Sequence, residues 1–189
     1  VEPIPNTPDW HSGALASDGT LYAAMADDLF ALDAATGDTL WVGPRATDGG
    51  WLLPPTVSAD GRTAYIKNTG DSLYAFDAAT GTIRWATADP YVDRIVFGVG
   101  TAVAGSRLVL PVFDRLQELD SSGSPLGLSS TYGHGFSEPV LDAAGTAFSV
   151  LSNPPGVRAY RPITTTRWAA PPRSRWTWFG GPALAAIAR

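Results

Sequence analysis

Hydrophobic residues alternate along two short segments that are nearly identical in sequence, LFALD (residues 29–33) and LYAFD (residues 73–77). Successive residues of an extended strand point to opposite faces, so Phe30 and Leu32 share one face and Ala31 lies on the other. Both faces are largely apolar in both segments. A strand of this kind is expected inside a stack of sheets, where a neighbour covers each face.

Strand and turn signals recur in the same order along the chain. Asp33 and Asp77 are 44 residues apart, Asp77 and Asp120 are 43 apart, and a degenerate equivalent, Arg161, follows after 41. Within each unit, four short strands joined by tight turns predict an antiparallel meander. A repeat of this length and composition is typical of one blade of a β-propeller.

The sequence therefore predicts an all-β protein, a β-propeller of four-stranded antiparallel blades. We expect four blades and the first strand of another, at residues 12–42, 54–86, 99–128, 138–169 and 181–189. Such a chain leaves the ring incomplete. It is either a fragment of a ring of seven or eight blades, or a second copy or a partner completes the ring, because an unpaired end blade exposes apolar strand faces and free edges.

The strand ending in aspartate leads in each unit to the same turn. There the carboxylate accepts backbone N–H bonds, a threonine adds a hydroxyl and a glycine takes positive φ. A tryptophan follows, large enough to be buried between adjacent blades. The residues of this repeated device are Ala31, Asp33, Thr36, Gly37, Trp41, Ala75, Asp77, Thr80, Gly81, Trp85, Asp120, Gly123 and Trp168.

The pattern A-x-D-x-x-T-G-D-x-x-W is complete from Ala31 to Trp41 and nearly complete from Ala75 to Trp85. It resembles the tryptophan-docking motif of the pyrroloquinoline-quinone (PQQ)-like β-propeller repeat. That family includes quinoprotein dehydrogenases, outer-membrane assembly scaffolds and many extracytoplasmic proteins. The resemblance, and a chain that begins on Val1 rather than Met, imply a location outside the cytoplasm, in the periplasm, secreted or at the cell surface.

Resemblance to the quinoprotein dehydrogenases would imply bound PQQ, a calcium ion held by carboxylate and amide oxygens, and an aspartate base. The carboxylates here are dispersed one or two per turn, and Asp27 and Asp28 fit a solvated hairpin turn. We therefore predict no catalytic residue, no metal site and no cofactor. A fragment of a PQQ- and calcium-dependent dehydrogenase is the alternative.

Composition and charge narrow the choice of partner. The formal net charge is -5 and no cluster of Lys and Arg occurs, which argues against nucleic acid. No apolar stretch is long enough to span a bilayer. Aromatic and Arg residues in the links between units are typical of protein interfaces. The candidate interface residues are His134, in a Gly-flanked loop, and Arg173, Arg175, Trp176 and Trp178. The alternatives are an exposed or locally bonded loop histidine for His134, and packing over the top of a blade for the others. We expect an extracytoplasmic scaffold or binding module with a protein partner.

Overall fold

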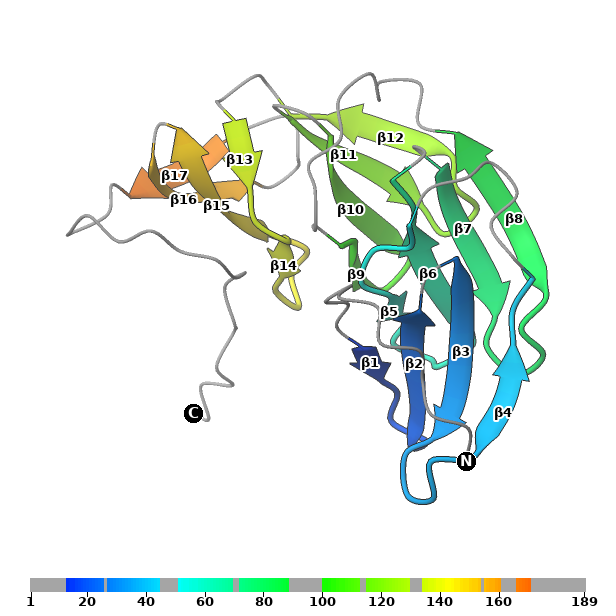
Figure 1. Cartoon of the computed structure of the whole chain (residues 1–189). Coiled ribbons are helices and arrows are strands. Elements are labelled where there is room, and N and C mark those ends of the chain that lie inside the picture. The colour runs from blue at the N-terminus through cyan, green and yellow to red at the C-terminus, as the bar shows by residue number, and fades with distance from the viewer. Residues whose placement is uncertain are drawn as a thin grey trace.

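The computed structural model describes residues 13–25, 27–44, 51–69, 72–88, 100–112, 115–129, 134–153, 155–160 and 166–170. All regular elements within these ranges are β-strands, and they form antiparallel sheets of strands that follow one another in the chain (Figure 1). The predicted all-β propeller fold is confirmed by this arrangement.

Four sheets, called blades 1 to 4 below, make up the described structure. Blade 1 consists of β1 (Gly13–Leu15), β2 (Thr20–Met25), β3 (Asp28–Asp33) and β4 (Thr39–Val42). Blade 2 consists of β5 (Thr56–Val57), β6 (Thr63–Lys67), β7 (Ser72–Asp77) and β8 (Ile83–Ala88). Blade 3 consists of β9 (Ala102–Ala104), β10 (Arg107–Val112), β11 (Arg115–Asp120) and β12 (Pro125–Leu128). Blade 4 consists of β13 (His134–Phe136), β14 (Val140–Leu141), β15 (Ala147–Asn153), β16 (Pro155–Tyr160) and β17 (Thr166–Ala170).

The blades follow one another along an arc. The first strands β1, β5, β9 and β14 lie next to one another on its inner side, whereas β4, β8 and β12 form its outer side (Figure 1). The faces of neighbouring blades therefore pack against each other. One edge of each sheet lies on the inner side of the arc and the other edge lies on its outer side. This is the radial stacking that the alternation of apolar residues predicted.

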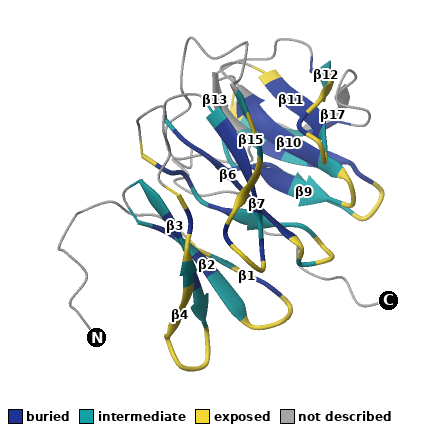
Figure 2. Cartoon of the chain, turned by 90° about the vertical axis from the view of Figure 1, so that its right-hand side faces the viewer, coloured by how far each residue is buried: buried dark blue, intermediate teal, exposed yellow. Residues whose placement is uncertain are grey.

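A separate apolar core fills each junction between blades. Between blades 1 and 2 it includes Leu29, Ala31, Ile66 and Phe76. The core between blades 2 and 3 is built from Tyr65, Leu73, Ala75, Leu108, Leu110 and Leu119, and the one between blades 3 and 4 from Val109, Leu116, Ala147 and Tyr160. Strands β6 and β7 are buried on both faces, as Figure 2 shows for the interior of the stack.

Blade 4 differs from the sequence expectation at its start. His134 was expected in a link between units, but His134–Phe136 forms β13 and pairs with the far end of β15. A related bridge joins Leu52 to Asn68 in blade 2. Both connections run beside the far end of the second strand, whose backbone N–H and C=O groups would otherwise lack partners.

The start of a fifth blade, expected at 181–189, lies outside the described residues. Within the ranges given above, the search for an apolar helix long enough to cross a membrane found none.

Candidate functional site

An aspartate side chain closes the turn after the third strand in blades 1 to 3. Its Oδ1 accepts the backbone N–H of the second residue after it, in the pairs Asp33–Ala35 (2.8 Å), Asp77–Ala79 (3.0 Å) and Asp120–Ser122 (2.9 Å). The turns end on glycines with left-handed φ values, 78° at Gly37, 72° at Gly81 and 84° at Gly123. Glycine adopts this conformation without a steric penalty from a Cβ atom.

Asp77 carries additional partners that Asp33 does not share. Its Oδ2 accepts a hydrogen bond from Arg84 at 2.7 Å, and its Oδ1 accepts one from the Thr80 hydroxyl at 3.1 Å. The Arg84 hydrogen bond, more than that of Thr80, lowers the pKa of the Asp77 carboxyl from its ordinary value. The charged carboxylate is thus favoured in the folded state.

Replacing Asp77 with Asn is expected to make the free energy of unfolding depend less on pH in the acid range. A carboxyl whose folded pKa is lowered stabilises the fold above its unfolded pKa, near 3.8, and this contribution is lost as the pH falls through the folded pKa. The measurement is the free energy of unfolding in urea across the acid range. An Asp77→Asn profile parallel to that of the wild type would contradict the assignment.

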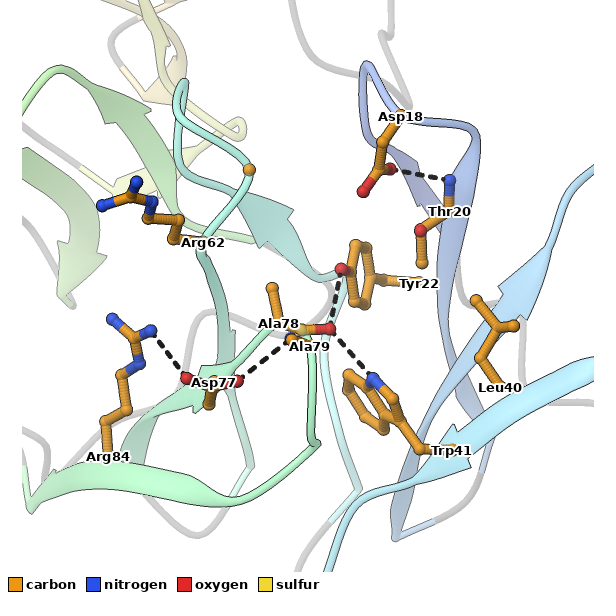
Figure 3. Close-up of a pocket in the computed structure, with 11 residues that line it drawn as sticks. Asp18, Thr20, Tyr22, Leu40, Trp41, Arg62, Asp77, Ala78, Ala79 and Arg84 are labelled. Carbon is orange, nitrogen blue, oxygen red and sulfur yellow. Dashed lines mark hydrogen bonds and ion pairs between the residues drawn. The ribbon is translucent and has the colours of Figure 1, made fainter.

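Each of the two tryptophans at the end of the motif reaches the turn of the following blade. Trp41 Nε1 donates to the carbonyl oxygen of Ala78 at 2.9 Å, and Trp85 Nε1 donates to that of Ser121 at 2.9 Å. Both indoles are half-buried. Tyr22 packs against Trp41 with ring centroids 5.8 Å apart, and its hydroxyl also donates to Ala78 O at 3.3 Å (Figure 3).

The glycines of these turns form part of the surface on which the tryptophans pack. A Cβ atom at Gly81 would lie 2.5 Å from Trp41 Cε3, and one at Gly123 would lie 2.9 Å from Trp85 Cζ3. A Cβ at Gly37 would meet no described atom within 4 Å. Gly81 and Gly123 are therefore required twice, for the left-handed turn and for the close approach of an indole.

Blade 3 makes its junction with blade 4 differently. Gly127 pairs with Glu118 in the register where Trp41 pairs with Ala31 and Trp85 with Ala75. Glu118 is buried and forms an ion pair with Arg107, whose Nη1 donates to the carbonyl oxygen of Gly145 in blade 4 at 3.4 Å. Sequence reasoning missed this pair. The available signal was a charged Glu at the motif position that Ala holds in the first two units.

A pocket of about 430 Å³ lies where Trp41 meets blade 2 (Figure 3). Charged and aromatic side chains from both blades line it, together with small turn residues: Asp18, Thr20, Tyr22, Leu40, Trp41, Gly61, Arg62, Asp77, Ala78, Ala79 and Arg84. Arg84 is held by Asp77 and by the Thr63 hydroxyl at 3.1 Å. Within the part of the chain that the structure describes, no hydrogen bond to the Arg62 guanidinium is found.

Two titratable groups of this pocket, Asp18 and Tyr22, have pKa values shifted by their surroundings. The backbone N–H of Thr20, at 2.9 Å from Asp18 Oδ1, and the Thr20 hydroxyl lower the pKa of Asp18. Burial raises the pKa of the Tyr22 phenol. Near neutral pH the carboxylates stay charged and the phenol stays protonated, whereas a general acid or base works best with a pKa near the working pH.

Two of the other predicted site residues, His134 and Trp168, lie in blade 4. His134 lies in β13, and Trp168 lies in β17 opposite Ala159, but the description of both is limited to the backbone. Arg173, Arg175, Trp176 and Trp178 lie outside the described residues, so their expected role at an interface stays a prediction. Among the residues that are described, no three His, Asp or Glu side chains come together as a metal site would require.

Comparison with known proteins places this geometry in a family. The sequence profile of the family described as outer membrane protein assembly factor BamB matches residues 5–124. No curated protein matches the chain significantly. Among solved structures, the chain is similar to BamB from Moraxella catarrhalis, with a TM-score of 0.63 and 16% identity over 84% of this chain and 48% of that chain.

A chain of the mitotic checkpoint complex is also similar, with a TM-score of 0.73 and 10% identity over 88% of this chain and 53% of that chain. At these identities the likeness shows the fold, a β-propeller in both cases. The chain spans about half the length of the solved structures that it matches. Because the family profile covers more than half of the 189 residues, the chain belongs to the BamB family of PQQ-like β-propellers.

Proposed function

We propose that the chain is part of a non-catalytic scaffold propeller that binds protein partners outside the cytoplasm, within a larger assembly. The family supports a scaffold and protein-interaction role, and its description, outer membrane protein assembly factor, supports the location. The observation that carries the proposal is an apolar sheet face that the described chain leaves open.

This open face lies on the side of blade 1 that points away from blade 2. Directly paired residues on neighbouring strands place their side chains on the same face of a sheet, and here they are Leu15 with Leu21, Leu21 with Leu32, Ala23 with Phe30, and Phe30 with Val42. The central residues are half-buried, while Leu15 and Val42 are 67% and 49% exposed. A contiguous apolar face of this kind marks an interaction site.

The open face matches the face that blade 2 presents to blade 1. The pair Leu21 and Leu32 corresponds in register to Ala64 and Phe76, and the pair Ala23 and Phe30 corresponds to Ile66 and Tyr74. In blade 2 these positions are buried in the core that the two blades share. A further sheet of the same repeat type is therefore the occupant that fits, from the rest of the same polypeptide or from a second copy.

The motif turn of blade 1 agrees with this assignment. The corresponding turns of blades 2 and 3 each hold the tryptophan of the preceding blade, and Gly37 has the same left-handed φ but no described neighbour on its Cβ side. A preceding blade with the same motif would bring its indole to Gly37 and Ala34. The half-length match to known propellers leaves room for such a blade.

We expect the purified chain to run heavier than its mass of 19.8 kDa, as a second copy or a complex. Light scattering during size exclusion, with mass spectrometry of every chain in the peak, measures this. Introducing Leu15→Lys together with Val42→Lys should yield the single chain, because two charges would then face the apolar surface of the partner. A stably folded wild-type monomer across a wide concentration range would overturn the proposal.

A matched control comes from blade 3. Leu126, on the outer strand β12, is 55% exposed, between the values for Leu15 and Val42, but lies away from the open face. Leu126→Lys should leave the native mass unchanged. An equal loss of association in this variant would indicate a general effect of surface charge and would count against the open face.

The proposed function requires no bound cofactor. The described donor atoms do not fit a calcium site, because three or more carboxylate or imidazole groups do not come together in the described ranges. The alternative, a fragment of a quinoprotein dehydrogenase, would gain support if added PQQ and calcium gave a quinone absorbance and dye reduction.

A further inference from the structure

The pocket between blades 1 and 2 has an exposed apolar side chain, Leu40, beside Trp41. Trp41 and Thr39 pair with consecutive residues of β3, so Leu40 between them is the additional residue of a β-bulge. A bulge changes the direction of a side chain, and here both Leu40 and Trp41 line the pocket. Because Leu40 is 54% exposed, the pocket has an apolar wall that is open to solvent.

Blade 2 supplies hydrogen-bond donors to the pocket. Arg62 stands directly before β6, and its carbonyl oxygen accepts the backbone N–H of Ala78 at 3.0 Å. The carbonyl oxygen of the same Ala78 holds the Trp41 indole and the Tyr22 hydroxyl. The backbone of Arg62 is thus fixed next to the aromatic residues of blade 1. Its side chain lines the pocket, and a guanidinium group carries five N–H donors (Figure 3).

Blade 1 supplies a hydrogen-bond acceptor. Asp18 lies in the turn before β2, and its Oδ1 accepts the backbone N–H of Thr20 at 2.9 Å. A carboxylate has about four lone-pair sites, so this bond leaves acceptor capacity for a ligand. In Figure 3 the Asp18 carboxylate and the Arg62 guanidinium lie on different sides of the pocket, one from each blade.

The charges that line the pocket balance one another. They are the carboxylates of Asp18 and Asp77 and the guanidinium groups of Arg62 and Arg84. Asp77 and Arg84 bind each other at 2.7 Å, which leaves Asp18 as an acceptor and Arg62 as a donor. A charged ligand would be attracted by one of these two groups and repelled by the other. A neutral amide has a C=O acceptor and an N–H donor, and can bind both.

We propose that this pocket binds a peptide segment of a partner protein. A backbone C=O of the peptide accepts from Arg62, a backbone N–H donates to Asp18, and an apolar side chain packs on Leu40. The volume of about 430 Å³ falls within the roughly 300–1,000 Å³ typical of binding pockets. The Trp41 indole is already fixed by its bond to Ala78 O, so binding does not have to order it. The inference rests on the proposed role in protein binding, but not on the open face of blade 1.

The test follows the indole N–H signal of Trp41 by NMR in the whole chain while the peptide acetyl-Ala-Leu-Ala-amide is added. We expect a saturable shift of this signal but not of the Trp51 indole signal, because Trp51 does not line the pocket. Acetyl-Ala-Ser-Ala-amide, which lacks the apolar side chain, should give little shift. No shift with the leucine peptide, or an equal shift with the serine peptide, would overturn the proposal. Binding of acetyl-Asp-Leu-Asp-amide or acetyl-Lys-Leu-Lys-amide about tenfold more tightly than the leucine peptide would also overturn it, in favour of a site for charged ligands.

Two variants and a matched control separate the pocket from general effects. Leu40→Ala should weaken binding of the leucine peptide by about fivefold, through loss of apolar contact. Arg62→Met keeps an aliphatic chain but removes the donors, and should weaken binding by about tenfold. The control is Leu126→Ala, because Leu126 is the bulge residue of β12 and is 55% exposed, but lies in blade 3. It should bind like the wild type. Unchanged binding by both pocket variants, or an equal loss in Leu126→Ala, would contradict the proposal.

The open face of blade 1 and this pocket can be tested separately. Leu15 and Val42 lie on the side of blade 1 that points away from blade 2, so the variant with Lys at both positions keeps the pocket. This variant should bind the leucine peptide like the wild type. Peptide binding in it therefore tests the pocket whether or not the open face holds a partner.

Discussion

Replacing Trp41 with alanine should lower the free energy of unfolding by about 2–3 kcal/mol. Fully buried tryptophans typically contribute about 3–5 kcal/mol, but the Trp41 indole is only half-buried. The variant loses the packing on Gly81 and the hydrogen bond to Ala78 O. Urea denaturation followed by circular dichroism measures the change.

Two controls show whether this loss belongs to the junction between blades. Trp51 is 55% exposed, and its hydrogen bonds to described residues are made by its backbone, with Thr69, so Trp51→Ala should cost less than about 0.5 kcal/mol. Trp41→Phe keeps an aromatic ring but not the N–H group, and should cost about 1 kcal/mol. A loss below about 1 kcal/mol for Trp41→Ala would contradict a stabilising role of this indole.

Gly81→Ala is the second change with a large expected effect, about 3–4 kcal/mol in the free energy of unfolding. The new methyl group must occupy a left-handed turn at φ 72° and would lie 2.5 Å from Trp41 Cε3. Strain in the turn and displacement of the indole both contribute. Urea denaturation again provides the measurement.

Gly37→Ala is the matched control, because Gly37 has φ 78° but no described neighbour within 4 Å of a Cβ position. It should cost only the backbone strain, about 1–2 kcal/mol. In a Trp41→Ala background, the cost of Gly81→Ala should fall to the same range, since the displaced ring is no longer there. Equal costs for Gly81→Ala and Gly37→Ala in the wild-type background would show that contact with the indole adds nothing.

The blades were predictable because their signals are local. Alternation in β3 and β7, and the aspartate turns that follow, depend on residues close together in the chain. Repetition of these signals predicted the four antiparallel sheets that the described residues form (Figure 1). The carbonyl that accepts each indole N–H belongs to the residue after the motif aspartate of the next unit, Ala78 or Ser121, so this contact depends on how two units pack and not on the pattern within one unit.

The contacts that the sequence could not predict join residues from different blades without a shared motif. Arg107 reaches Gly145, and Glu138 approaches Pro54 across Gly100. Each depends on how the sheets are placed against one another, which local patterns do not encode. The sequence pattern predicted an exposed apolar end blade only in general terms, because it predicted an incomplete ring. It did not identify the open face around Phe30, which the described residues leave uncovered.

Each indole hydrogen bond points forward along the chain, from Trp41 to Ala78 and from Trp85 to Ser121. A ribosome makes the acceptor after the donor, so an emerging blade stays loosely held until the next turn has been synthesised. At these two junctions, stability is therefore added only after the turn of the following blade has been made. Blade 1 is thus fastened to blade 2 once the turn at Ala78 has been synthesised. Domains generally fold as units during synthesis, and this delay gives the protein a direction in which its parts become fixed.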